Sequence, residues 1–219
     1  GLVTSISPIA LEVARNQFAS IADEMGMVLR RTSYSPNIKE RADCSAAIFV
    51  ASGEMLAQAE HIPVHLGSMP ASVAAVLDRF GEGVQPETQY AVNDPFFGGT
   101  HLNDLTLVRP VFYERELVGW VANRAHHADV GGAVPGSMAP QSDVFAEGLR
   151  IPPVRWFRGG QEDPDVRAVL LANMRDPEHR EADLAAQAGA LHLGCRRLEQ
   201  LAGSGRGLSR LAVRGRDLV

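Results

Sequence analysis

The sequence predicts an α+β fold, in which an N-terminal helix and a C-terminal helical segment accompany antiparallel β-hairpins. Near both ends of the chain, apolar residues recur every three or four positions, as they do on the buried face of a helix. Between these segments, two pairs of apolar runs are each joined by a short turn. Helices and strands do not alternate along the chain, which disfavours a doubly wound parallel sheet.

The N-terminal helix is predicted to begin at Pro8, because Ser7 suits the N-cap and proline suits the first helical position. It should end before Pro36, since the residue that precedes a proline avoids helical dihedral angles. Its apolar face would be formed by Leu11, Ala14, Phe18, Ile21, Met25 and Val28.

A first hairpin and a second helix are predicted to follow. Residues 45–50 and 55–59 flank a short turn that contains Gly53, which is typical of a β-hairpin. The second helix should open at Pro70 and close at Gly81, because proline favours the first turn of a helix and glycine favours its end.

A second hairpin is predicted from two runs, 105–112 and 117–125, that are rich in Val, Leu and aromatic residues. The charged segment 114–116 between them is interpreted as a three-residue turn. A long loop rich in Gly and Pro then runs from about residue 129 to residue 142.

The C-terminal helix is predicted from a near-heptad spacing of apolar residues, after which the pattern stops at Gly203. We therefore expect one structural unit over residues 1–202, and a poorly structured tail or truncation end over 203–219. The residues with this spacing are Leu184, Ala188, Leu191, Cys195 and Leu198.

The acidic balance of the chain excludes several classes of function. A formal net charge of -5 and a pI near 5.8 provide no basic surface for nucleic acid. No run is apolar for long enough to span a membrane, and the first residues lack the features of a secretion signal. We therefore expect a cytoplasmic protein that binds neither nucleic acid nor membrane.

Two residue types limit the chemistry that the chain can perform. Cys44 and Cys195 lie far apart and form no CxxC pair, which argues against a disulfide scaffold or a zinc knuckle. Lys39 is the only lysine and lies in no phosphate-binding motif, which nearly excludes a Schiff-base or P-loop lysine. If the protein uses ATP, the phosphates are therefore held elsewhere.

Histidines and aspartates gather at the ends of the second hairpin, namely His101, Asp104, His126, His127 and Asp129. In an antiparallel hairpin, the residue that begins the first strand and the residue that ends the second lie side by side. Two imidazoles and one carboxylate at such a point suit a catalytic Zn, Mn or Fe site with open coordination positions. The cluster therefore predicts a divalent metal centre.

The histidine that ligates depends on the strand register. A three-residue turn places Asp104 opposite His126, whereas a slip of one residue brings His127 to that face instead. The spacing alone leaves both alternatives open.

Five segments resemble the hydantoinase B family, and the resemblance covers nearly all of residues 6–201. Several long motifs in the same order are far more specific than any one of them alone. The motifs are YSPNIKER at 34–41, AEHIPVHLGSMP at 59–70, NDPFFGGTH at 93–101, ANRAHHADVGG at 122–132 and EGLRIPP at 147–153.

The resemblance implies a metal site and a partner. The family includes N-methylhydantoinase B subunits, the matching half of 5-oxoprolinase and the large subunits of acetone and acetophenone carboxylases, all of which couple ATP to carbonyl chemistry. In the acetone carboxylase branch, two histidines and one aspartate hold manganese, and that pattern falls here on His101, Asp104 and His126. His127 and Asp129 would then support the ligands or act as general acid and base. ATP would be bound by a separate hydantoinase A-type subunit in a hetero-oligomer.

By this resemblance, the chain is expected to be the N-terminal portion of a larger subunit of an ATP-dependent cyclic amidase that opens hydantoin or 5-oxoproline-type rings. One alternative is a metal- and ATP-dependent ketone carboxylase subunit, in which the metal holds an enolate for attack on carbon dioxide. A further alternative is an inactive remnant or assembly piece, because family members are considerably longer than this chain.

Overall fold

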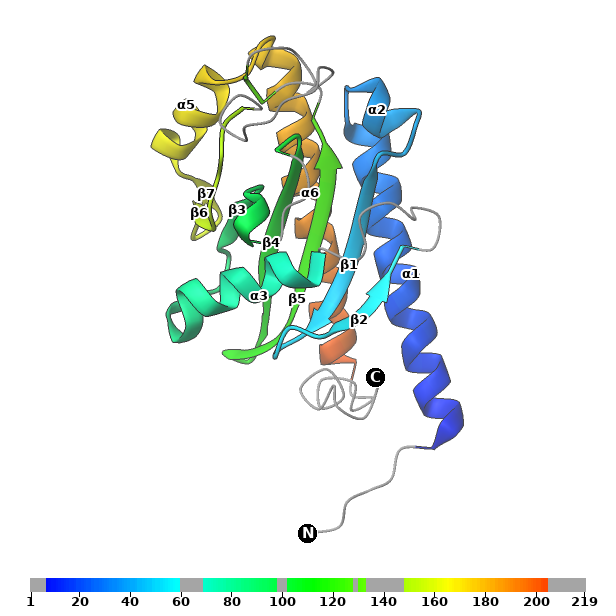
Figure 1. Ribbon diagram of the computed structural model, residues 1–219. Helices are drawn as coiled ribbons and strands as arrows, with labels where there is room; N and C mark the ends of the chain where they lie inside the picture. The colour runs from blue at the N-terminus through cyan, green and yellow to red at the C-terminus, as the bar shows by residue number, and fades with distance from the viewer. Residues whose placement is uncertain (1–6, 60–68, 98–101, 128–129, 133–147, 205–219) are drawn as a thin grey trace.

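The computed structural model describes residues 7–59, 69–97, 102–127, 130–132 and 148–204. The helices and strands are arranged in one layered unit (Figure 1). In chain order they are α1 (Pro8–Thr32), α2 (Pro36–Lys39), β1 (Cys44–Val50), β2 (Met55–Gln58), α3 (Met69–Phe80), η1 (Gly81–Gly83), β3 (Gln89–Val92), η2 (Pro95–Phe97), β4 (Asp104–Tyr113), β5 (Glu116–His126), β6 (Val154–Arg158), β7 (Gln161–Glu162), α5 (Pro164–Ala172) and α6 (Pro177–Gly203).

The strands form one seven-stranded antiparallel sheet in the order β2-β1-β5-β4-β3-β6-β7. The predicted α+β class and both predicted hairpins are confirmed, but the hairpins are joined by pairing between β1 and β5. Sequence reasoning missed β3, β6 and β7, which have two to five residues each. Such short strands offer too few residues for a clear alternation of apolar and polar positions.

The predicted helices are confirmed with small shifts at their ends. Ser7 caps α1 by accepting a hydrogen bond from the Ala10 backbone N–H at 3.2 Å. The C-terminal helix ends at Gly203, close to the expected boundary, and residues 205–219 of the expected tail lie outside the described part of the chain. None of the helices in the described segments is both long and apolar enough to cross a membrane.

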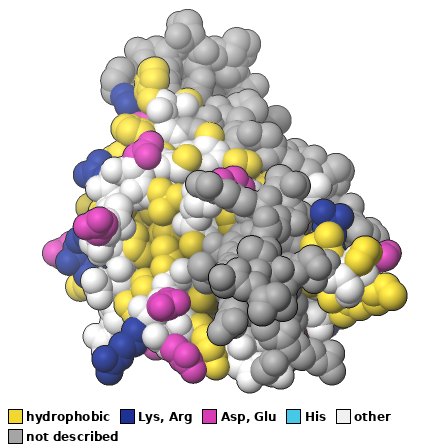
Figure 2. Space-filling view, turned by 90° about the horizontal axis from the view of Figure 1, so that it is seen from below, with side chains coloured by type: hydrophobic (Ala, Val, Ile, Leu, Met, Phe, Trp, Pro, Cys, Tyr) yellow, Lys and Arg dark blue, Asp and Glu magenta, His cyan; other side chains and the backbone are white. Residues whose placement is uncertain are grey.

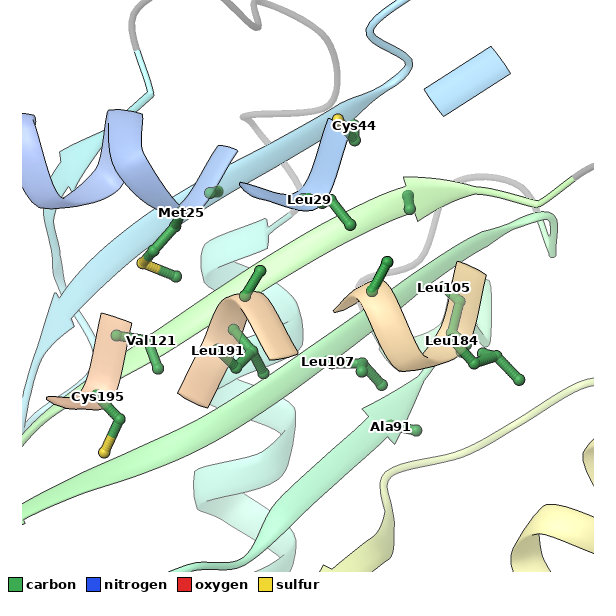
Figure 3. Close-up of a cluster of buried hydrophobic side chains, with 14 of the residues drawn as sticks. Met25, Leu29, Cys44, Ala91, Leu105, Leu107, Val121, Leu184, Leu191 and Cys195 are labelled. Carbon is green, nitrogen blue, oxygen red and sulfur yellow. The ribbon is translucent and has the colours of Figure 1, made fainter. Parts of the chain in front are cut away.

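Helices cover both faces of the sheet. α1 and α6 run side by side in opposite directions against one face, and α3 crosses the other (Figure 1). The larger core lies between the sheet and the α1–α6 pair, where side chains from all three meet (Figure 3). Those drawn there include Met25, Leu29, Leu105, Leu107, Val121, Leu184 and Leu191. A second core lies under α3 and contains Val73, Val76, Tyr90, Trp120 and Ala122.

The turn between β4 and β5 differs from the predicted one. Tyr113 pairs with Glu116, which leaves a two-residue turn instead of three residues. The turn residues Glu114 and Arg115 have φ angles of 49° and 69°, in the left-handed region used by type I′ turns. These turns are favoured in hairpins because their twist matches that of the paired strands.

A β-bulge then restores the register that the three-residue turn would have given. Phe112 pairs with Leu117 but Val111 pairs with Gly119, so β5 contains one extra residue at this point. From the bulge onward, the pairing brings the first residue of β4 opposite the last residue of β5. Without the bulge, Asp104 would lie opposite Ala125, so the bulge is what brings His126 to face Asp104.

Candidate metal centre

Asp104 and His126 form the centre of the candidate site. They are paired residues at the end of the β4–β5 ladder, and Asp104 Oδ1 lies 2.9 Å from His126 Nδ1. The Asp104 side chain is fully buried, whereas 23% of the His126 side chain is exposed. The pair is therefore accessible to solvent through the imidazole. The opposite end of the sheet, seen from below in Figure 2, presents hydrophobic and charged side chains, and no described histidine is visible there.

A second carboxylate, which sequence reasoning missed, lies beside this pair. The Asp43 carbonyl accepts a hydrogen bond from the His126 backbone N–H at 3.0 Å, and Asp43 Oδ2 lies 4.0 Å from His126 Nδ1. Asp43 immediately precedes β1, which pairs with β5 along its whole length. In the sequence, Asp43 could be recognised only as an acidic residue at the start of an apolar strand. That it lies beside His126 depends on the pairing of β1 with β5, which are distant in the sequence.

A buried cation lies one step further along the same face of the sheet. Arg124 is fully buried, and its Nε donates to Thr106 Oγ1 at 2.7 Å while Nη2 donates to Ser72 Oγ on α3 at 2.9 Å. Burial lowers the pKa of Arg124, and the nearby carboxylate of Asp104 opposes that shift. The opposite charges therefore compensate one another beneath the site.

Hydrogen bonding to Asp104 raises the pKa of His126, although burial of the ring acts in the opposite direction. The imidazole and the carboxylate thus form a charge-assisted pair when His126 carries its second proton. Metal ions bind neutral imidazole and ionised carboxylate, so His126 Nδ1 can act as a ligand beside Asp104 in the neutral tautomer that carries its proton on Nε2.

His127 turns to the other face of the sheet, because successive side chains of a strand alternate. It is fully buried, and its Nε2 lies 2.7 Å from Gln187 Oε1 on α6. Gln187 Nε2 donates to the Leu105 carbonyl at 2.9 Å, which leaves its Oε1 to accept from the histidine. Among the described residues, His127 Nδ1 has no hydrogen-bond partner, and burial lowers the pKa of the ring, which favours the neutral imidazole. The side chain of His127 therefore lies against α6, on the opposite face of the sheet from the Asp104–His126 pair.

The remaining predicted site residues, His101 and Asp129, lie outside the described residues. Within the segments that the structure describes, no group of three His, Cys, Asp or Glu side chains is arranged to hold a metal ion. The structure thus brings together two of the three predicted ligands.

Comparison with known proteins identifies the family. The family model described as hydantoinase B/oxoprolinase matches residues 7–207. The chain belongs to the hydantoinase B/oxoprolinase family. It is 38% identical over 200 residues to caprolactamase subunit beta of Pseudomonas jessenii, covering 91% of this chain and 34% of that protein. It is also 38% identical over 201 residues to the 5-oxoprolinase of Dictyostelium discoideum, covering 91% of this chain and 16% of that protein.

Solved structures agree with this hydantoinase B assignment. The ATP-dependent caprolactamase from Pseudomonas jessenii superposes with a TM-score of 0.86 and 36% identity, over 97% of this chain and 37% of that one. An acetone carboxylase also gives a TM-score of 0.86, at 21% identity, over 94% of this chain and 28% of that one, which shows a shared fold alone. The chain spans about a third or less of the length of the curated relatives named above.

The two described ligand candidates of this hydantoinase B chain fit a divalent metal ion. Two donor atoms that each lie roughly 2.1 Å from one ion, at roughly 90–110° to each other, are about 3.0–3.4 Å apart. The 2.9 Å between Asp104 Oδ1 and His126 Nδ1 is close to this spacing. An imidazole and carboxylates are donors that Zn, Mn and Fe accept.

Proposed function

We propose that this chain is part of the B-type subunit of an ATP-dependent cyclic amidase, which opens hydantoin or 5-oxoproline-type rings at a His/Asp metal centre. The Asp104–His126 pair supports this proposal, because it sets a carboxylate beside a partly exposed imidazole, a donor pair that divalent metal ions accept, in a chain of this family. Caprolactamase and 5-oxoprolinase, the relatives compared above, are each named for a cyclic amide. The substrate proposed here belongs to the same chemical class.

Asp104, His126 and the predicted ligand His101 would hold the ion, and the Asp43 carboxylate, with its Oδ2 at 4.0 Å from His126 Nδ1, would add negative charge beside it. A divalent ion held there would polarise a carbonyl or lower the pKa of a bound water. The chain's own contribution would be to hold the two proposed ligands at paired strand positions, with Arg124 compensating the buried carboxylate of Asp104. His127 and Asp129 remain predicted as acid–base or supporting residues.

ATP would be bound by a hydantoinase A-type partner, and it would activate the amide by phosphorylating the amide oxygen. Transfer of the γ-phosphoryl group to the amide oxygen would release ADP and weaken amide resonance, so that water could add to the carbonyl carbon. Collapse of the tetrahedral intermediate would then break the C–N bond and leave the ring nitrogen as an amine, and hydrolysis of the remaining acyl phosphate would give the carboxylate and free phosphate. The subunit designation of the caprolactamase relative supports a hetero-oligomeric enzyme. The absence of a lysine from any phosphate-binding motif in this sequence agrees with ATP binding by another subunit.

Metal analysis of the purified protein tests the metal centre. We expect about one equivalent of bound divalent metal in the wild type, and loss of most of it in Asp104→Ala. Asp165→Ala, which removes an exposed carboxylate at the start of α5, should retain the metal. Stoichiometric metal in the Asp104 variant would refute its role as a ligand.

A coupled assay tests the reaction. The chain, within its full subunit and together with the A-type partner, should open a lactam or hydantoin ring only when ATP is present. Bicarbonate-dependent consumption of a ketone would instead support the carboxylase alternative. A metal-loaded complex that performs neither reaction would reject both enzymes and favour the inactive assembly piece.

A further inference from the structure

A buried carboxylate on α6 binds the backbone between α1 and α2. This connection, residues 33–35, is called the α2 corner below. Asp183 is fully buried, and its Oδ1 accepts hydrogen bonds from the backbone N–H groups of Tyr34 at 2.7 Å and Ser35 at 2.9 Å. The two segments are separated by about 148 residues in the sequence. Hydrogen bonds to a carboxylate are stronger than those between neutral groups. Asp183 therefore fixes the backbone at the start of α2.

Other contacts between α6 and this corner are weaker or more exposed. The Tyr34 ring stacks on His179 with centroids 3.8 Å apart, but more than half of the Tyr34 surface is exposed. Arg180 Nη2 lies 3.9 Å from Asp183 Oδ2, which is too far for a hydrogen bond. The paired N–H bonds to Asp183 are thus the principal polar anchor of the corner among the described residues.

The anchored corner leads within a few residues to Asp43. α2 begins at Pro36, directly after Ser35, and Ile38 is fully buried. The Asp43 backbone N–H then donates to the Asn37 carbonyl at 2.8 Å. From Asp43 onward the chain is held by the β1–β5 ladder. The position of the Asp43 carboxylate beside His126 therefore depends on the α2 corner at one end and on the sheet at the other.

We propose that Asp183 is a positioning residue for the candidate metal centre, which it serves by locking the α2 corner that delivers Asp43. This inference rests on the proposed function, in which Asp43, with its Oδ2 at 4.0 Å from His126 Nδ1, places a second carboxylate beside the two proposed ligands. Asp183 acts through backbone N–H groups rather than through contact with the ion. A residue of this kind resembles the hydrogen-bonded partners that orient metal ligands in other proteins.

Lys39, the only lysine of the chain, offers a single-site probe of the corner. It is exposed at the end of α2, so within these 219 residues a lysine-specific endoproteinase can cut only after Lys39. When opening is fast, the cleavage rate follows the population of the locally open state. We expect Asp183→Ala to be cut roughly tenfold faster than the wild type or more, because two bonds to a charged acceptor are lost.

Two further variants separate hydrogen bonding from a general loss of folding. Asp183→Asn keeps one oxygen that can accept both N–H groups, so its cleavage rate should stay within a few-fold of the wild-type rate. Glu178→Gln, an exposed change in the first turn of α6, is the matched control and should not alter the rate.

The same variants are then titrated with Zn²⁺ against a chromophoric chelator, after circular dichroism has shown that each is folded. Asp183→Ala should bind Zn²⁺ roughly ten- to a hundredfold more weakly, whereas Asp183→Asn and Glu178→Gln should bind as the wild type does.

Wild-type Zn²⁺ affinity in Asp183→Ala, with or without faster cleavage, would overturn the inference while leaving the proposed metal centre intact. Equal weakening in Asp183→Asn would overturn the hydrogen-bond explanation. A wild-type chain that binds no Zn²⁺ would remove the proposed function and the inference together.

Discussion

Asp104 faces His126 across β4 and β5 with 2.9 Å between their side-chain atoms, and the next pair on the same face is Thr106 with Arg124. The site is thus the outermost step of a polar ladder whose inner step contains a buried guanidinium. A buried charge is stable only when neighbouring groups compensate it. The inner pair therefore influences the stability of the outer one.

Replacing the buried cation should destabilise the fold. Arg124→Gln removes the charge that compensates Asp104 and the bonds to Thr106 and Ser72, so we expect a loss of about 3 kcal/mol. Arg158→Gln, at an exposed position of β6, should change the stability by less than about 0.5 kcal/mol. Urea denaturation measures the free energy of unfolding of both variants. Equal midpoints for the two variants would show that Arg124 is not a structural cation.

The β4–β5 turn should be improvable, because it holds two non-glycine residues at positive φ. Replacing Glu114 and Arg115 by Asn and Gly should stabilise the protein by about 1 kcal/mol, since this pair prefers the type I′ turn. The β6–β7 turn already has Gly159 and Gly160, with φ of 57° and 76°. Gly160→Ala should therefore destabilise by about 1 kcal/mol. Thermal denaturation of the two variants should show shifts of opposite sign, and shifts of the same sign would contradict the strain argument.

Much of the fold could be predicted because its signals are local. The spacing of apolar residues in α1 and α6 repeats over many turns, and β4 and β5 are long strands joined by a short turn. Even there, the predicted three-residue turn was wrong, and the bulge that compensates for it leaves no mark in the pattern of residue types. The pairing of Asp104 with His126 agrees with the prediction, although the turn that produces it does not.

The rest of the site depends on contacts between distant segments. Asp43 lies beside His126 only because β1 pairs with β5, and Asp183 reaches the α2 corner from the other end of the chain. A single sequence carries no periodic signal for such pairs. His127 illustrates a further limit, because its burial against Gln187 follows from the packing of α6 on the sheet and not from the hairpin.

Cys195 should be chemically inert in the folded protein. Burial raises the pKa of its thiol to about 12, so that at pH 8 only about one molecule in ten thousand carries the reactive thiolate. Iodoacetamide should leave Cys195 unmodified in native buffer and alkylate it fully in urea, as measured by peptide mass spectrometry. Rapid native alkylation would show that the α6 core opens readily.

The same pKa shift gives a direction to the pH dependence of stability. Since the folded-state pKa of Cys195 lies above that of the unfolded thiol, its contribution is fully present below about pH 8.5. That contribution is lost as the pH rises toward 12. Cys195→Ser should therefore flatten the fall in unfolding free energy between about pH 8.5 and 10.5. An unchanged slope would contradict the shifted pKa.

Two glycines of α6 should respond to alanine in opposite ways. A Cβ at Gly194 would clash with the side chain of Met25 on α1, at 2.9 Å from Met25 Cγ, and Met25 is itself fully buried. Because this buried side chain or the two helices would have to shift, Gly194→Ala should destabilise the protein by about 1–3 kcal/mol. A Cβ at Gly189 meets no atom within 4 Å, so Gly189→Ala should stabilise by up to about 1 kcal/mol through helix propensity alone. Met25→Ala opens a cavity of its own, but its combination with Gly194→Ala should cost less than the sum of the two single losses, since the truncated side chain makes room for the new methyl group. Urea midpoints of the wild type and these variants decide the matter, and a stabilising Gly194→Ala would mean that α1 and α6 pack less closely than described.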